Sequence, residues 1–361
     1  MIKSKNLKYQ LGIILIAALI YIPLIGKVHL FDWDEINFAE SAREMIETND
    51  YLTVQINYQP FWEKPPLFIW GQVISMKLFG INEFASRLPN AICGILTLLV
   101  LFNLGTRLRN RQFGLFWALS HGASILPLLY FKSGIIDPWF NLFIFLAIHH
   151  AILFINSQKD KNVILSAFFI GLSVLTKGPA GFLIFGLTAF IFLIIKRFKI
   201  KITFRQIIYF LLFFGLIGGL WFIILIFSGN KEIIKDFIYY QMKLFSTKDA
   251  GHGGFLFYHF VVLFFGVFPA SIFALNPLLR KYYQDKDMHD YMLVMKILFW
   301  VVLILFTIVK TKIVHYSSMC YFPISFLAAS FLEKYMSSKT GFTKIQNVSI
   351  WVILNLCKSC L

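Results

Sequence analysis

The sequence predicts an all-α polytopic membrane protein with about eleven transmembrane helices. Of its 361 residues, 58% are hydrophobic and only 14% are charged, whereas ordinary soluble domains carry about 25% charged residues. A soluble domain of this length has too little interior to bury so much apolar surface, which includes 42 phenylalanines. The apolar stretches are long and unbroken instead of alternating, so helices are favoured over a β-barrel.

The chain begins with a basic segment that leads into an apolar one. Lys3, Lys5 and Lys8 precede the apolar run 11–25, and no small-residue cleavage site follows it. We therefore expect a retained first helix and not a signal peptide. The next segment, 27–84, is the least hydrophobic long stretch and is predicted to be a first outer loop. The remaining apolar segments are 85–106, 112–130, 138–156, 162–176, 178–195, 206–228, 255–279, 291–309, 314–332 and 346–361.

The basic residues predict the orientation of these helices. With the N-terminus in the cytoplasm, the cytoplasmic loops receive more than half of the 34 Lys and Arg, including the clusters 107–111 and 196–205. The opposite face receives most of the 18 Asp and Glu. The positive-inside rule therefore supports eleven helices in a multi-pass protein of the plasma (inner) membrane. The same rule and attraction to anionic lipid headgroups explain the net charge of +16, so we expect no nucleic-acid partner.

We predict a single transmembrane domain over residues 1–361, with a second large outer loop at 228–254 and no soluble domain. The first outer loop opens with three acidic residues beside an aromatic one, Asp32, Trp33, Asp34 and Glu35. Apolar residues then recur at helical spacing over 36–46, which predicts an amphipathic helix lying in the membrane interface. Helix capping by Asp32 and a capping box with Glu35 explain two of the acids. A catalytic carboxylate is the alternative.

The same loop ends in Glu63 and Lys64, followed by Pro65 and Pro66. The prolines fix an extended or turned backbone, and the apolar segment 67–79 is too short to span, so it is expected to lie along the surface. Two interpretations of the charged pair stay open. It is either a solvated ion pair of little energetic worth or a positioned cation beside a metal or sugar ligand.

Further charges fall where apolar segments meet the outer face. Asp137 precedes a proline at a helix start, where it could act as a cap. Lys177 and Lys312 could reach the lipid headgroups or form a phosphate trap, because an anion in a low-dielectric site needs cations nearby. His252 lies among glycines in the second outer loop, with no core around it to pack against.

The chain contains an ordered set of short motifs. They are Asp34-Glu35, Ala39-Glu40, Arg43-Glu44-Met45, Glu63-Lys64-Pro65-Pro66, Leu78-Phe79-Gly80, Arg87-Leu88-Pro89, Asp137, Thr176-Lys177-Gly178-Pro179, and Lys312 with Tyr316 and Pro323. In this order, the set resembles that of the bacterial aminoarabinose (lipid A) transferases and the protein O-mannosyltransferases, which are membrane glycosyltransferases of the GT-C class. The resemblance covers about residues 10–330.

The resemblance implies a GT-C fold and transfer of a sugar from a polyprenyl-phosphate donor to a lipid, glycan or protein acceptor at the outer face. It implies a divalent metal (zinc, magnesium or manganese) and no nucleotide, and the chain contains no GxGxxG or Walker motif. Implied site residues are Asp34 and Glu35 for catalysis; Lys64, Lys177, Lys312, Tyr316 and Arg87 for donor phosphate; Asp137, Arg43 and Trp62 for the substrate pocket; and Glu63 with His252 for the metal.

Transport is the alternative function that stays open at this point. Intramembrane charges and short helices also occur in transporters and flippases of lipid-linked or anionic substrates. The carboxylates here cluster on one face instead of at the midplane, and no inverted repeat is evident.

The resemblance also implies a C-terminal extension that this sequence lacks, so it predicts either a short member or a truncated product.

Overall fold

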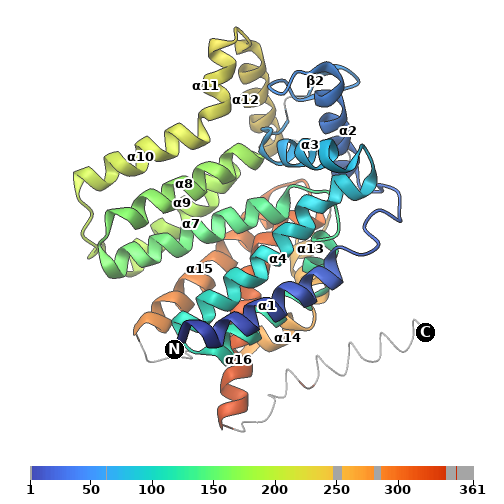
Figure 1. Ribbon diagram of the computed structural model, residues 1–361. Coiled ribbons are helices and arrows are strands. Elements are labelled where there is room, and N and C mark those ends of the chain that lie inside the picture. The colour runs from blue at the N-terminus through green and yellow to red at the C-terminus, as the bar shows by residue number, and fades with distance from the viewer. Residues whose placement is uncertain (1, 62, 247–253, 280–285, 339–346, 348–361) are drawn as a thin grey trace.

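A computed structural model of the protein describes residues 2–61, 63–246, 254–279, 286–338 and 347. The regular structure of these residues is helical apart from one small antiparallel hairpin, Gln55–Ile56 (β1) with Gln59–Pro60 (β2) (Figure 1). The helices are α1 (Ile2–Tyr21), α2 (Trp33–Thr48), α3 (Leu67–Phe79), α4 (Glu83–Leu108), α5 (Arg111–Gly122), α6 (Ile125–Tyr130), α7 (Asp137–Ser157), α8 (Asp160–Lys177), α9 (Ala180–Ile195), α10 (Phe204–Gly218), α11 (Leu220–Phe227), α12 (Lys231–Ser246), α13 (Tyr258–Gly266), α14 (Ala270–Leu279), α15 (Lys286–Ile308), the 3₁₀ helix η2 (Val314–Cys320) and α16 (Tyr321–Ser338).

The predicted membrane character is confirmed, and the predicted number of spans remains a prediction. Among the described residues, three helices are long and apolar enough to cross a membrane, namely α4, α7 and the Met288–Ile308 part of α15. The pairs α10–α11 and α13–α14 pass the same test together but bend by 59° and 119°. Helices α3 and α9 are apolar but short. The last predicted segment, 346–361, lies almost wholly outside the described residues.

Three apolar segments that were predicted to be continuous are each divided between two α-helices in the structure. Segment 112–130 forms α5 and α6, segment 206–228 forms α10 and α11, and segment 255–279 forms α13 and α14. Gly218 and Gly219 lie at the second break, where glycine lowers helix propensity. Pro269 lies at the third, where it has no N–H to donate to the preceding turn. Apolar composition alone does not locate such breaks.

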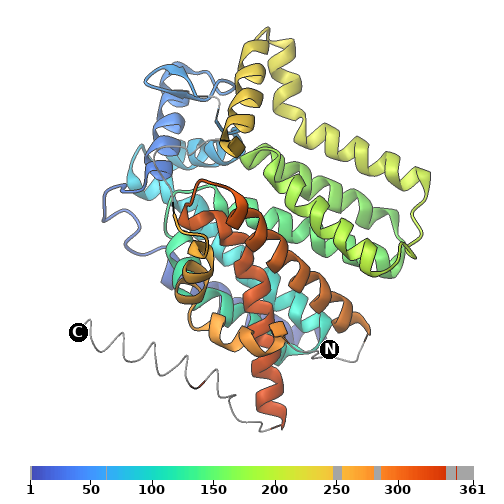
Figure 2. The same ribbon diagram turned by 180° about the vertical axis from the view of Figure 1, so that it is seen from behind.

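The centre of the membrane part is built around one indole ring. Trp117 of α5 is fully buried, and its ring packs against Phe145 of α7, Tyr291 of α15 and Phe326 of α16 at centroid distances of 5.7, 6.0 and 5.0 Å. Burying large aromatic side chains in edge-to-face contact stabilises the junction of the four helices. Seen from behind, α15 and α16 run side by side across this region (Figure 2).

The segment 27–84, predicted to be the first outer loop, folds into a helical platform made of α2 and α3. Helix α2 begins after Asp32, whose carboxylate accepts a hydrogen bond from the Asp34 N–H, and it ends at Asn49 in the left-handed conformation. Its apolar stripe packs on α3, which has the bounds predicted for a short surface segment. The buried side chains shared by the two helices are Phe38, Ala39, Ala42, Met45, Phe68, Ile69, Val73 and Met76. The predicted amphipathic helix is thus confirmed as a helix.

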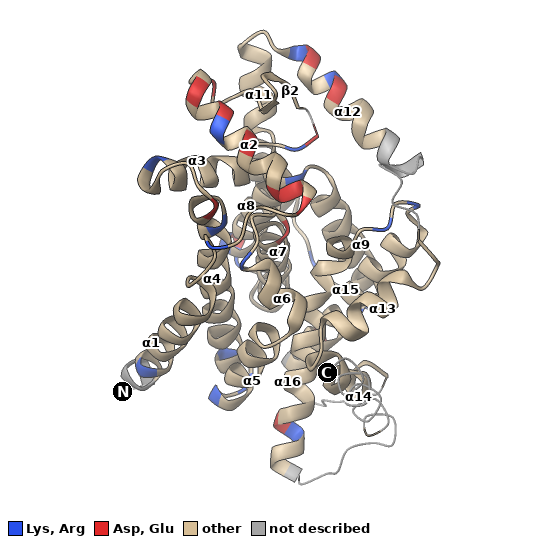
Figure 3. Ribbon diagram, turned by 90° about the vertical axis from the view of Figure 1, so that its right-hand side faces the viewer, with Lys and Arg blue, Asp and Glu red and all other residues tan. Residues whose placement is uncertain are grey.

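The platform, the hairpin and α11–α12 lie at one end of the molecule, and the loop between α9 and α10 lies at another (Figure 1). Acidic residues gather around α2 and α12, while the far ends of α1 and α5 carry Lys and Arg (Figure 3). The described part of the predicted second outer loop, 228–254, contains a helix, α12, that the sequence did not predict.

Candidate functional site

A buried ion pair fixes the start of α2. Both carboxylate oxygens of Glu35 accept hydrogen bonds from Arg87 of α4, at 2.7 and 2.9 Å, and Oε1 also accepts one from the Gly134 N–H at 2.6 Å. The remaining Arg87 donors bind the carbonyl oxygens of Ile25, Val28 and His29. All five guanidinium N–H groups are therefore used. This network ties α2 and α4 to the loop that precedes α7, and so it sets the positions of Asp34 and Asp137.

Asp137 and Lys177 form a second buried pair. The Lys177 ammonium lies 2.7 Å from Asp137 Oδ1, and the Ser318 hydroxyl donates to the same oxygen at 3.4 Å. Lys177 is the last residue of α8, and Gly178 ends the helix with a φ of +85°, a conformation that favours glycine. A Cβ at Gly178 would also come within 3.0 Å of the Phe237 ring. The last residue of α8, Lys177, is thereby held next to the first residue of α7, Asp137.

His315 of η2 connects this pair to α2. Its Nε2 lies 3.4 Å from Asp34 Oδ2 and 3.9 Å from Asp137 Oδ2. The imidazole is buried, whereas a quarter of the Asp34 side chain is exposed. Asp137 Oδ2 is buried without a hydrogen-bond partner among the described atoms. An imidazole between two carboxylates can hold one of them in a fixed orientation for proton transfer.

A cavity of about 540 Å³ opens beside these charges. Lys64, Asp137, Lys177, Gln241 and Tyr316 contribute polar groups to its wall. The rest of the wall is mainly apolar and comes largely from α9 and the end of α15. The cavity is therefore amphipathic, with cations at one side and a hydrocarbon-like wall at the other. Its apolar lining residues include Phe182, Leu183, Ile184, Leu187, Phe306 and Val309.

Lys64 reaches this cavity from the loop before α3. Its ammonium lies 3.6 Å from Glu63 Oε2 and 5.6 Å from the centroid of the Tyr240 ring. The Gln241 amide of α12 donates to the Glu63 carbonyl at 3.2 Å. Helix α12 thus covers the loop, and the Lys64 side chain is only 13% exposed. A cation held in this way keeps its charge close to the apolar wall.

Comparison with solved structures identifies this arrangement of helices. The crystal structure of ArnT from Cupriavidus metallidurans bound to undecaprenyl phosphate superposes with a TM-score of 0.82 at 19% identity, over 98% of this chain and 64% of that one. The apo structure of the same protein superposes with a TM-score of 0.78. The chain therefore has the fold of this solved ArnT structure.

Sequence comparisons agree with this fold. Residues 63–228 match the family described as dolichyl-phosphate-mannose-protein mannosyltransferase. The undecaprenyl phosphate-alpha-4-amino-4-deoxy-L-arabinose arabinosyl transferase of Wigglesworthia glossinidia brevipalpis is 24% identical over 96% of this chain and 62% of its own length. The corresponding protein of Yersinia enterocolitica is 26% identical over 87% of this chain and 57% of its own length. The chain therefore spans about three fifths of these relatives.

This fold brings several of the predicted site residues together. Lys64, Asp137, Lys177 and Tyr316 share the wall of one cavity, and Asp34 joins them through His315. Tyr316 also places its ring 5.5 Å from the Lys177 ammonium. The roles that the resemblance implies for these residues stay predictions.

Three predicted residues have contacts that point to a structural role instead. Glu35 and Arg87 use their charged groups on each other and on the backbone, so neither is placed for catalysis or phosphate binding. The predicted capping box between Asp32 and Glu35 is wrong as well. The Asp32 carboxylate accepts from the Asp34 N–H, and the Glu35 carboxylate binds Arg87. The Lys312 ammonium donates to the carbonyl oxygens of Phe306, Thr307 and Val309 at 2.7–2.9 Å, which uses its three donors at the end of α15.

Arg43 is also engaged within α2. Its guanidinium contacts Glu40 and Glu47 at 2.6 Å each, and it lies 5.9 Å from the centroid of the Tyr58 ring. The hydrogen bonds from Arg43 hold the pKa of Glu40 below its usual range. This network stabilises the outer surface of α2, and Arg43 does not line the cavity.

The predicted metal site rests on residues that the structure describes only in part. Trp62 and His252 lie outside the described residues. Glu63 provides one carboxylate, which contacts the Lys64 ammonium. No group of three or more His, Cys, Asp or Glu among the described residues could hold a metal ion. Metal dependence therefore remains a prediction.

Sequence reasoning missed His315, Asn141 and Ser318. The Asn141 amide donates to the Ser318 hydroxyl at 2.8 Å, which in turn donates to Asp137. Asn141 lies one helical turn after Asp137 on α7, so an i, i+4 search from a suspected carboxylate would have found it. His315 is next to Tyr316 in the sequence, but its link to Asp34 depends on a long-range contact between η2 and α2.

Proposed function

We propose that the protein is a multi-pass membrane glycosyltransferase that moves a sugar from a polyprenyl-phosphate donor to an acceptor at the outer leaflet of the inner membrane. The observation that carries this proposal is the amphipathic cavity, in which Lys64 and Lys177 face an apolar wall formed by α9 and α15. A polyprenyl phosphate has the same division into an anionic head and a long hydrocarbon chain. The similar ArnT crystal structure is bound to undecaprenyl phosphate, which supports this choice of donor.

The two lysines serve the leaving group. As the bond between the sugar C1 and the phosphate oxygen breaks, negative charge grows on the departing polyprenyl phosphate. Lys64 and Lys177, both largely buried, stabilise that charge in a site where water is scarce. Asp137 keeps Lys177 oriented before the donor binds.

Asp34 serves the acceptor. The acceptor oxygen or nitrogen forms the new bond to C1, and its proton passes to the Asp34 carboxylate. Such a proton transfer by a positioned side chain contributes about 10²–10⁴-fold to the rate. His315 acts as a positioning residue, because its Nε2 holds Asp34 Oδ2 on the side of Asp137.

The acceptor is a lipid, glycan or protein exposed at the outer face. The exposed part of Asp34 and the exposed apolar side chains Trp33 and Ile36 on the same turn favour an acceptor that arrives at the membrane surface. The predicted orientation, with basic loops in the cytoplasm, places α2 on that outer side.

Transport of a lipid-linked anion is the competing function. A transporter needs a site reachable from both faces near the midplane. Here Asp34 lies on α2 and Lys64 directly precedes α3, while the Asp137–Lys177 pair is joined to Asp34 through His315. Helices α2 and α3 lie at one end of the molecule (Figure 1). This arrangement favours transfer over transport.

The purified protein in liposomes provides the test. With a radiolabelled polyprenyl-phosphate sugar and an envelope lipid extract, we expect label to move to the acceptor and unlabelled polyprenyl phosphate to accumulate. Lys64→Ala should reduce donor binding, while Lys8→Ala, at an exposed position on α1, should not. Release of label to the opposite side of the bilayer without a new glycosidic product would support the transporter. Mass spectrometry of envelope glycolipids and glycoproteins from a deletion strain then identifies the acceptor.

A further inference from the structure

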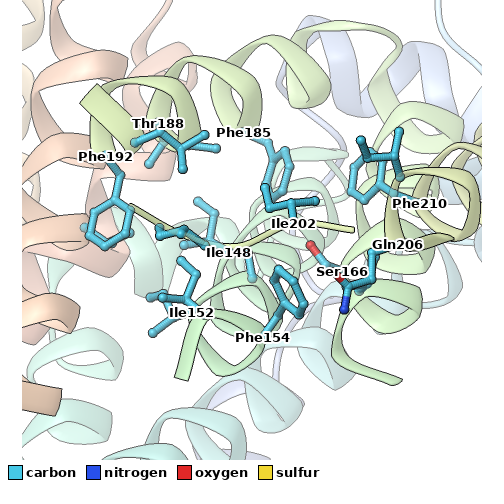
Figure 4. Close-up of a pocket in the computed structure, with 18 of the residues that line it drawn as sticks. Ile148, Ile152, Phe154, Ser166, Phe185, Thr188, Phe192, Ile202, Gln206 and Phe210 are labelled. Carbon is cyan, nitrogen blue, oxygen red and sulfur yellow. The ribbon is translucent and has the colours of Figure 1, made fainter. Parts of the chain in front are cut away.

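A second cavity lies between α7, α8, α9, α10 and α15, with a volume of about 270 Å³ (Figure 4). Its wall is almost entirely aliphatic and aromatic, and the labelled side chains Ile148, Phe185, Phe192 and Phe210 surround a common space. A cavity of about 150 Å³ with such walls stays dry and takes up benzene. The larger cavity here has room for a section of hydrocarbon chain.

The polar groups on this wall are already satisfied. The Ser166 hydroxyl donates to the Ala147 carbonyl at 2.9 Å, and the Thr188 hydroxyl donates to the Ile184 carbonyl at 2.7 Å. The Gln206 side chain donates to Asp160 and accepts from the Thr203 N–H. None of the three is left to recognise a polar ligand, so the part of a ligand that enters this cavity is apolar.

A polar hollow of about 640 Å³ adjoins the apolar cavity, and Ile155 and Ile200 line both. Three lysines contribute to the hollow. Lys196 pairs with Asp290, the acid in its wall. Lys199 and Lys201 are exposed and make no ion pair within the described part of the chain. The hollow thus presents two cations beside an entrance to hydrocarbon.

The hollow and the proposed active site lie at opposite ends of α9. Residues Pro179 to Leu187 contribute to the donor cavity, and Phe185 to Leu193 contribute to the second cavity, with Lys196 and Lys199 following the helix end. The sequence predicts the cluster 196–205 to be cytoplasmic, where anionic lipids are concentrated. Side chains of α9 and α10 around the entrance are exposed and apolar, including Ile194, Ile195, Ile207 and Leu211. A membrane lipid can therefore enter the cavity laterally from the bilayer, between α9 and α10.

We propose that this pair of cavities is a binding site for an anionic phospholipid, with one acyl chain between α7, α9 and α10 and the headgroup phosphate on Lys199 and Lys201. The positive charge of Lys199 and Lys201 favours an anionic headgroup, and the apolar wall of the second cavity favours an acyl chain. The site is distinct from the donor cavity because the Asp34, Asp137 and Lys177 cluster lies beyond the other end of α9. The bound lipid stabilises the α9–α10 connection.

Native mass spectrometry of the full chain in detergent tests the site, with phosphatidylglycerol and phosphatidylcholine of equal chain length as probes. We expect phosphatidylglycerol to bind more tightly, and each of Lys199→Ala and Lys201→Ala to weaken its binding about fivefold. Lys8→Ala is the matched control and should have no effect. Equal binding of the two lipids by the parent protein would overturn the proposal.

A series of phosphatidylglycerols with acyl chains of increasing length tests the apolar cavity without a mutation. Affinity should rise with chain length, and Ala189→Phe, which fills the cavity wall, should flatten that rise. A flat series, or equal binding of glycerol phosphate without chains, assigns the lysines to a free anion and overturns the lipid site. Displacement of phosphatidylglycerol by undecaprenyl phosphate at equal concentration would show that the donor chain occupies this cavity and would also overturn it. Loss of sugar transfer in Lys64→Ala, with lipid binding unchanged, separates the two sites.

Discussion

The imidazole Nε2 of His315 lies 3.4 Å from Oδ2 of Asp34, although the two residues belong to segments near opposite ends of the described chain. Asp34 is in the first turn of α2, and His315 is in η2, which follows α15. The contact joins the acceptor side of the proposed site to the Asp137–Lys177 pair. The helical platform of α2 and α3 and the helices α7 and α8 thus contribute to one polar cluster.

Asp34→Asn separates catalysis from helix capping. Asn keeps the size of the side chain but removes the charge that accepts the proton, so we expect transfer to fall by about 10²–10⁴-fold. If Asp34 only favours the helix N-terminus, the change costs about 0.3–1 kcal/mol of stability and leaves transfer nearly intact. The measurement is the transfer rate at saturating donor beside the melting temperature. Asp32→Asn is the matched control, since Asn also caps helices well.

Glu35→Gln is expected to act on stability. It removes the charge that faces the buried Arg87 guanidinium, and breaking a buried pair from one side costs about 3–5 kcal/mol. Arg87→Lys should be nearly as damaging, because an ammonium cannot replace five N–H donors held in a fixed fork. Thermal unfolding in detergent measures both effects. A melting temperature equal to that of the parent, with transfer lost, would restore Glu35 to the catalytic residues.

The sequence predicted the parts of the fold that depend on local pattern. Segment 67–79 and the amphipathic helix of the first loop are correct, because apolar spacing and capping residues act over a few positions. The breaks at Gly219 and near Pro269 were missed, since glycine and proline are also tolerated inside membrane helices.

For the site, the sequence located charges but not their partners. Lys177 and Lys312 look alike in the sequence, since each follows an apolar segment at the predicted outer face. One binds Asp137 beside the cavity, and the other binds three carbonyl oxygens at the end of α15. The difference comes from which element packs opposite each lysine, and this is a long-range property of the fold.

Lys312→Met therefore should reduce stability and spare donor binding. The substitution keeps an unbranched side chain but leaves the carbonyls of Phe306, Thr307 and Val309 without a donor, at a cost on the order of 1–3 kcal/mol. Lys64→Ala should show the opposite pattern, and Lys64→Arg should recover donor binding only in part. Donor dissociation constants and melting temperatures of the three variants decide this. Weaker donor binding in a stable Lys312→Met protein would contradict the structural role.

The Glu40–Arg43 pair predicts a pH dependence of stability. Hydrogen bonds from Arg43 lower the pKa of Glu40 in the folded protein, so the pair stabilises the fold above the unfolded pKa of Glu, about 4.3. That contribution is lost as the pH falls through the lower folded pKa. The difference in melting temperature between the parent and Glu40→Gln should be constant near neutral pH and should shrink below about pH 4.3. A difference that stays the same down to about pH 3, well below the unfolded pKa, would mean that the charge of Glu40 contributes nothing.

The Asp137–Lys177 pair allows stability and donor binding to be separated. Lys177→Met leaves the Asp137 carboxylate buried and uncompensated, which should cost about 3–5 kcal/mol of stability and weaken donor binding as well. Adding Asp137→Asn removes the unpaired charge, so the double variant should regain most of the lost stability. It should not regain donor binding, because the cation that meets the phosphate is still absent. Melting temperature and binding of the polyprenyl-phosphate sugar donor by the parent, both single variants and the double variant complete the cycle. If the double variant binds donor as the parent does, Lys177 serves only to neutralise Asp137, and the phosphate is held by Lys64 without it.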